Sequence, residues 1–119
     1  MRRILFVDLG KNMLPYYLAA KKLGLEVVAI SDQRLGGKDL KYRKIPIFDD
    51  AACRRFIFDA AIVSNLSPVH AAQRRDAWRL SLVGDTRPVI DLFEDRRFAS
   101  VTFADRASRG FHQTVARSA

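Results

Sequence analysis

The sequence is poor in the residues that would give it a disulfide framework, a metal site or a membrane span. Its single cysteine, Cys53, excludes an internal disulfide and a multi-cysteine zinc site, and favours a reducing cytoplasm. The two histidines, His70 and His112, lie too far apart in the sequence to suggest a metal site. No apolar run approaches the roughly 20 residues of a transmembrane helix. We therefore expect a cytoplasmic protein without a metal site and without a membrane partner.

The balance of charge is basic, with a net charge of +8. Such a balance favours polyanionic partners, namely nucleic acid, nucleotide phosphate or an acidic membrane. The basic residues are scattered in pairs, at Arg2-Arg3, Lys21-Lys22, Arg54-Arg55, Arg74-Arg75 and Arg96-Arg97. Because such pairs are typical of solvated helix faces, nucleic acid is not an expected partner.

Short apolar runs alternate with helical patterns along the chain. Strands are predicted at residues 4–7, 27–30, 45–48, 60–63 and 89–93, and helices at residues 13–23, 51–56 and 67–84. The first apolar run ends at Asp8, which favours a buried strand over a signal peptide. Ser67 and Pro68 form a typical helix start, and Pro46 predicts an edge position for its strand.

This alternation predicts right-handed crossovers and a parallel sheet. We expect an α/β three-layer sandwich with a Rossmann-like parallel sheet of about five strands in the order 3-2-1-4-5, and helices on both faces. Residues 1–94 would form this domain. Residues 95–119, which are rich in arginine, would form a C-terminal arm or tail, a candidate contact for a second copy or a partner protein.

Two sets of apolar residues are expected to face the core from helices. They are Met13, Leu14, Tyr17, Leu18 and Leu23 in the first helix, and Trp78, Leu80, Leu82 and Val83 in the last.

The candidate site follows from the topology. In an open parallel sheet, ligands bind outside the carboxyl ends of the strands, near the point where the strand order reverses. Residues 8–12, 31–32 and 64–65 follow three of the predicted strands. We therefore expect these three loops to meet in one crevice.

The stretch from Arg3 to Glu94 resembles a Rossmann-type nucleotide-binding domain, in particular the small N-terminal domains of sugar-nucleotide-modifying enzymes such as bacterial sugar acyltransferases. The matching stretches are "VDLGKNM", "LEVVAISDQ", "GGKDLKYRKIPIF" and "FDAAIVSN". The resemblance implies a nucleotide or nucleotide-sugar ligand, and it covers about three quarters of the chain. It rests on the order of elements rather than on a strict motif.

The chain departs from the family's phosphate loop. Aligned with G-x-G-x-x-G, it has Asp8, Gly10 and Met13 at the three glycine positions. Gly10 still allows phosphate binding at the helix N-terminus, where Asn12 is the predicted cap. The Asp8 carboxylate would repel a pyrophosphate at this position, and Lys11 would partly offset that repulsion. The alternative is a plain strand-to-helix turn.

The resemblance also gives Asp32 a role, because an acid at the end of the second strand binds ribose hydroxyls in the dinucleotide fold. Such an acid favours an NAD-like or nucleotide-sugar ligand over a 2′-phosphate, unless Arg34 intervenes; the alternative is a loop-capping aspartate. The candidate cofactor-binding residues are Gly10, Lys11, Asn12, Asp32, Ser64 and Asn65, without an identified cofactor.

The expected function is a non-catalytic nucleotide or nucleotide-sugar binding domain. No set of nucleophile, base and orienting residue can be assembled, so we predict no catalytic residue, although a small enzyme acting on a nucleotide-linked substrate remains an alternative. A second alternative is a degenerate receiver-like interaction module. There Leu9 replaces one acid of the receiver's acidic pair, and Ser64 stands where the phospho-accepting aspartate would be.

Overall fold

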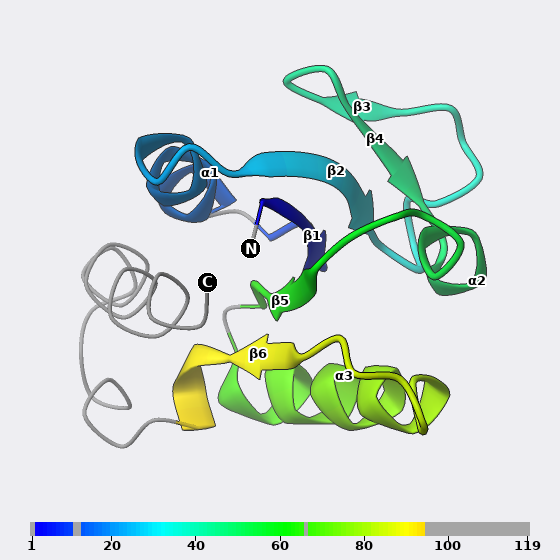
Figure 1. Cartoon of the computed structure of the whole chain (residues 1–119). Coiled ribbons are helices and arrows are strands. Elements are labelled where there is room, and N and C mark those ends of the chain that lie inside the picture. Colours follow the sequence, from blue (N-terminus) through cyan, green and yellow to red (C-terminus); the bar gives the residue numbers. More distant parts are fainter. Residues whose placement is uncertain (1, 11–12, 66, 95–119) are drawn as a thin grey trace.

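The protein folds as an α/β structure around one mostly parallel sheet (Figure 1). The computed structural model describes residues 2–10, 13–65 and 67–94. Its strands are β1 (Arg3–Val7), β2 (Glu26–Ser31), β3 (Lys41–Tyr42), β4 (Ile45–Phe48), β5 (Ala60–Val63) and β6 (Val89–Asp91). The six strands lie in the order β3-β4-β2-β1-β5-β6. The predicted α/β class is confirmed.

The predicted strand count and order are corrected by β3. This strand of two residues pairs antiparallel with β4 and takes the edge position that Pro46 had suggested for β4. Pro46 is tolerated there because it precedes the two β4 residues, Ile47 and Phe48, that pair with β2. The predicted last strand is also shorter, because residues 92–94 form a 3-10 turn, η1 (Leu92–Glu94).

Helices cover both faces of the sheet. Helix α1 (Met13–Lys22) lies on one face, and α2 (Asp50–Cys53) and α3 (Pro68–Ser81) lie on the other. The start of α3 is as predicted, with the Ser67 hydroxyl accepting the His70 N–H and Pro68 in the first helical turn. Asp49 caps α2 by accepting the Ala52 N–H at 2.9 Å.

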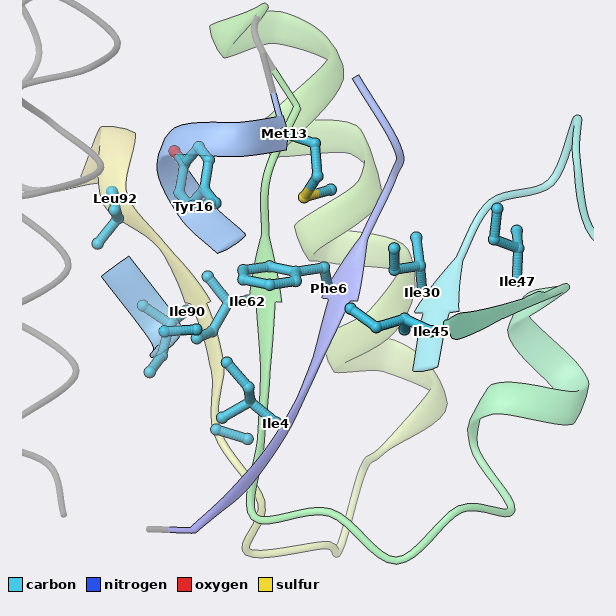
Figure 2. Packing of buried hydrophobic residues seen from close by; sticks show 12 residues of the cluster. Ile4, Phe6, Met13, Tyr16, Ile30, Ile45, Ile47, Ile62, Ile90 and Leu92 are labelled. Carbon is cyan, nitrogen blue, oxygen red and sulfur yellow. The ribbon is translucent and has the colours of Figure 1, made fainter. Parts of the chain in front are cut away.

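The side chains of β1 alternate between two apolar clusters, one on each face. Ile4 and Phe6 point toward α1, whereas Leu5 and Val7 point toward α3. In Figure 2, the Phe6 ring lies beside Tyr16 of α1, and their centroids are 6.0 Å apart in an edge-to-face contact. Because β1 is buried on both faces, it fixes the centre of the sheet.

The predicted core faces of the helices need correction. In α1 the buried residues are Met13, Tyr16 and Ala20, whereas Leu14 and Leu18 are 40% and 52% exposed. In α3 and the turn that follows it, Trp78 and Leu82 are buried, but Leu80 and Val83 point to solvent. The buried positions follow the three- and four-residue spacing of one helix face, so apolar residues between them turn outward.

Two further sequence predictions concern the C-terminal arm and a membrane span. The arm at residues 95–119, with His112, lies outside the described residues. Across the described ranges, no helix has both the length and the apolar character needed to cross a bilayer.

Candidate functional site

The loops after β1, β2 and β5 meet at the carboxyl edge of the sheet. The Asp8 N–H donates to the Ser31 carbonyl at 2.7 Å, and the Leu9 N–H donates to Asp32 Oδ2 at 3.0 Å. From the third loop, Asn65 Nδ2 donates to Asp8 Oδ2 at 2.8 Å. The convergence predicted from the topology is confirmed for the described parts of these loops.

A cleft of about 330 Å³ opens where the three loops meet. It is lined by Asp8, Leu9, Gly10, Asp32, Gln33, Arg34, Asn65 and Arg74. Of the predicted binding residues, it therefore contains Gly10, Asp32 and Asn65. Lys11 and Asn12 lie outside the described residues.

Asp8 occupies a backbone conformation that favours glycine. Its φ is +77°, in the left-handed region, at the position aligned with the first glycine of the phosphate loop. Its carboxylate accepts from Arg74 Nε at 2.9 Å through one oxygen and from Asn65 through the other. The loop after β5 and helix α3 thus hold this carboxylate in the lining of the cleft.

Arg74 of α3 joins Asp8 to Asp50, the first residue of α2. Its two terminal nitrogens donate to both carboxylate oxygens of Asp50, each at 2.7 Å, in a bidentate pair. The hydrogen bonds to Asp50 raise the pKa of Arg74 against the opposing effect of burial. The guanidinium therefore carries a permanent positive charge between two carboxylates.

Asp50 stays ionised although it is buried. Burial alone would raise its pKa, but hydrogen bonds from Arg74 and from the Ser31 hydroxyl outweigh burial and lower it. Its backbone N–H donates to the side-chain oxygen of Gln33 at 3.2 Å. Ser31, Asp50, Arg74 and Asp8 thus form one polar network, of which Asp8 and Arg74 line the cleft.

Sequence reasoning assigned neither Arg74 nor Asp50 to the site. The Arg74-Arg75 pair was interpreted as a solvated helix face, yet both arginines are partly buried and ion-paired. The available signal was position: Arg74 lies three residues after Ala71 and four before Trp78, and both of these are buried. A charged residue inside the apolar stripe of a helix indicates a buried carboxylate partner.

The Asp32 carboxylate is mainly used to shape its own loop. Oδ1 accepts the N–H groups of Arg34 at 2.9 Å and Leu35 at 3.0 Å, and Oδ2 accepts the Leu9 N–H. The residue is 7% exposed, so little of it faces the cleft. Since a carboxylate oxygen accepts two hydrogen bonds, Oδ2 retains one acceptor position for a ligand hydroxyl.

Ser64 and Asn65 have different positions at the site. Ser64 is 1% exposed, and its hydroxyl lies 2.6 Å from the Asp8 carbonyl oxygen, so it supports the floor of the cleft. Asn65 lines the cleft, and its side-chain oxygen accepts the Ser67 N–H at 2.9 Å. Each residue stabilises the strand-to-helix connection that shapes the site.

Among the described residues, the histidine and the cysteine do not line the cleft. His70 is exposed on the first turn of α3. Cys53 is fully buried, and burial raises the pKa of its thiol to about 11, so it is a protonated packing residue at neutral pH. The described part of the chain contains no group of three or more side chains suited to a metal ion.

No known protein family, curated protein or solved structure matches this chain. The function is therefore inferred from the chemistry of the cleft and from its place in the sheet.

Proposed function

We propose that the chain is a non-catalytic binding domain of Rossmann type for a nucleotide or a nucleotide-sugar, with the ligand in the cleft of Asp8, Asp32 and Arg34. The observation that carries the proposal is the position of this cleft. It lies at the carboxyl edge beside β1, where the chain switches from one half of the sheet to the other. This is the usual ligand position in open parallel sheets.

The size and chemistry of the cleft support a compact ligand. Its volume of about 330 Å³ is at the lower end of the range of roughly 300–1,000 Å³ for ligand pockets, which fits one nucleoside or sugar unit better than an extended dinucleotide. Asp8 and Asp32 Oδ2 offer acceptors for hydroxyl groups. Arg34 has no acidic partner among the described residues, so its guanidinium is available for a phosphate.

Arg74 offsets the negative charge of Asp8, the feature of the sequence that opposes phosphate binding. An unpaired Asp8 carboxylate would repel a phosphate at Gly10. Since Arg74 and Asn65 each donate a hydrogen bond to that carboxylate, its charge is largely offset before a ligand arrives. An anionic ligand then meets a polar rim rather than an isolated negative charge.

The same pairing favours binding over catalysis. Asp8 is held by Arg74 and Asn65, and Asp32 by three backbone N–H groups. Carboxylate oxygens that already accept hydrogen bonds within the protein have few positions left at which to accept a proton from a substrate. Within the described ranges, the cleft is therefore suited to holding a ligand.

The test is a thermal-shift titration with NAD, uridine-diphosphate sugars and nucleoside mono- and diphosphates. A ligand at a hundred times its dissociation constant should add about 2.7 kcal/mol to the free energy of unfolding. Arg34→Ala, which removes an exposed cation from the rim, should weaken binding at least tenfold. Lys38→Ala, in the same loop but outside the cleft, is the matched control.

Two outcomes would contradict the proposal. One is the absence of any stabilisation by these compounds, and the other is equal binding by Arg34→Ala and the parent protein. Phosphorylation by acetyl phosphate with magnesium, seen as added mass, would instead support the receiver-like alternative. Asp32→Ala is a poor probe, because it would release the three N–H groups that shape the loop.

A further inference from the structure

A basic surface lies apart from the cleft, where α1 meets the hairpin of β3 and β4. The contact is made by two tyrosines, Tyr17 and Tyr42, whose rings meet edge to face with centroids 5.9 Å apart. Arg43 lies over both rings, at 5.5 Å from the centroid of Tyr17 and 5.8 Å from that of Tyr42. Lys21 lies 5.7 Å from the Tyr17 centroid. The hairpin and α1 therefore present their cations side by side.

We define the α1–hairpin surface as Leu14, Leu18, Lys21, Lys22, Arg43 and Lys44, all of which are exposed. Leu14, Leu18 and Lys21 are spaced at four and three residues, so they follow one face of α1. Within the described part of the chain, none of the four cations has an acidic side chain within ion-pairing distance. The surface thus combines unpaired positive charge with exposed leucine.

We propose that the α1–hairpin surface binds the surface of an anionic lipid membrane. Unpaired lysine and arginine are attracted to acidic headgroups, and exposed leucines gain free energy by entering the boundary of the acyl chains. The partner is a membrane surface that the protein lies on rather than spans. The sequence alone had led to the opposite expectation, that the protein has no membrane partner.

The arrangement favours lipid over single-stranded nucleic acid. Nucleic acid binding needs aromatic faces on which bases stack. Here Tyr17 and Tyr42 are half-buried against each other and have cations over their rings. The exposed Leu14 and Leu18 would have no role beside a phosphate backbone, whereas a membrane buries them.

The proposal is independent of the ligand cleft. The turn of Arg43 and Lys44 precedes β4, so it lies at the amino-terminal edge of the sheet, opposite the cleft. The four cations of the surface thus lie towards the edge opposite the cleft, whereas Leu14, in the first turn of α1, lies nearer the cleft edge.

The turn offers a variant that separates binding from folding. Arg43 and Lys44 have φ angles of +47° and +70°, which favour asparagine and glycine in a hairpin turn. Arg43→Asn combined with Lys44→Gly should therefore fold with an unchanged or higher melting temperature. It should lose affinity for anionic vesicles about thirtyfold, because two cations near the membrane are removed.

The assay is co-sedimentation of the full chain with vesicles of phosphatidylcholine, alone or mixed with phosphatidylglycerol, at low and high salt. We expect binding only to the mixed vesicles, with a steep loss at high salt. Leu14→Ser combined with Leu18→Ser should weaken this binding about tenfold. Arg55→Glu is the control. It lowers the net charge as much as the Arg43→Asn, Lys44→Gly variant does, but on the opposite face of the sheet, so it should bind vesicles like the parent protein.

Three results would overturn the proposal. The first is an absence of sedimentation with anionic vesicles at low salt. The second is unchanged binding by the Arg43→Asn, Lys44→Gly variant. The third is tighter binding of a labelled oligonucleotide than of vesicles, with no effect of the leucine substitutions, which would assign the surface to nucleic acid.

Discussion

The two halves of the molecule use their basic residues differently. In α3, Arg74, Arg75 and Arg79 each form an ion pair with a carboxylate, at 2.7, 3.2 and 2.6 Å. On α1 and the β3–β4 hairpin, Lys21 and Arg43 face aromatic rings and have no acidic partner among the described residues. Similar side chains therefore fix the fold in one half and remain available to a partner in the other.

The difference depends on where a basic residue lies on its helix. Lys21 and Lys22 lie on the outer face of α1, where water solvates them, whereas Arg74 and Arg75 lie beside buried Trp78 and Ala71. A buried guanidinium needs carboxylate partners, and the chain supplies them from distant segments. Basic pairs that look alike in the sequence are thus distinguished by the helix face on which they lie.

The largest expected effect comes from removing the paired cation at the centre of the network. Arg74→Leu leaves Asp8 and Asp50 partly buried without a counter-charge, and should lower the free energy of unfolding by about 3 kcal/mol. The matched change in the other half, Lys22→Leu, should alter it by less than about 0.5 kcal/mol. Urea denaturation of both variants measures the contrast, and equal losses would contradict it.

The pH dependence of the Arg74→Leu variant sharpens the same test. In the parent protein the pKa of Asp50 is lowered from 3.8. The ionised carboxylate therefore stabilises the fold above about pH 4, and this stabilisation is lost as the pH falls through the pKa that Asp50 has in the folded protein. Without Arg74, burial would raise the pKa of Asp50. Its protonated form would then relieve the unpaired charge, and the stability deficit of the variant should shrink between neutral pH and about pH 4. A deficit independent of pH would point to lost packing instead.

Much of the fold could be predicted because the local sequence patterns agree with the strands and helices that the whole chain forms. β1 reads as an unbroken apolar run because it is buried on both faces, and Ser67 with Pro68 marks the start of α3. The sequence did not predict β3, because two residues give no periodicity and its pairing with β4 depends on a turn at Arg43 and Lys44. That turn carries none of the asparagine or glycine that normally signals a hairpin.

The place of the candidate site could be predicted from the sequence, but the contacts within it could not. Parallel strands end at one edge, so residues 8, 32 and 65 had to be neighbours. Arg74 and Asp50 lie in elements that approach this edge only through tertiary packing, so no local pattern linked them to Asp8. The role of Asp32 was also open from sequence, because an acid that caps its loop and an acid that binds ribose occupy the same position.

In the half that contains α1 and the β3–β4 hairpin, a substitution is expected to raise the free energy of unfolding by a smaller amount. A left-handed backbone costs an ordinary residue roughly 1–2 kcal/mol, so Arg43→Asn with Lys44→Gly should relieve strain at both positions. The loss of the Arg43 contacts with Tyr17 and Tyr42 offsets part of the gain, at about 0.5–1 kcal/mol. We expect a net rise of about 1 kcal/mol in the free energy of unfolding, measured by urea denaturation. A fall would show that the cation–aromatic contacts hold the hairpin to α1.

The smallest effect is expected for the exposed ion pair of α3, between Arg79 and Glu94. Arg79 donates to Glu94 at 2.6 Å, and this hydrogen bond lowers the pKa of Glu94, yet both side chains are substantially exposed. A double-mutant cycle of Arg79→Ala and Glu94→Ala should give a coupling of only about 0.5 kcal/mol, because water and salt screen the pair. The cycle is needed because Arg79 also donates to the Val89 carbonyl at 2.8 Å, which the single variant would lose as well. The coupling should fall at high salt and as the pH drops below the range in which Glu94 ionises. A coupling of about 3 kcal/mol, as large as the loss expected for Arg74→Leu, would mean that exposure does not separate the arginines of α3 into strong and weak pairs.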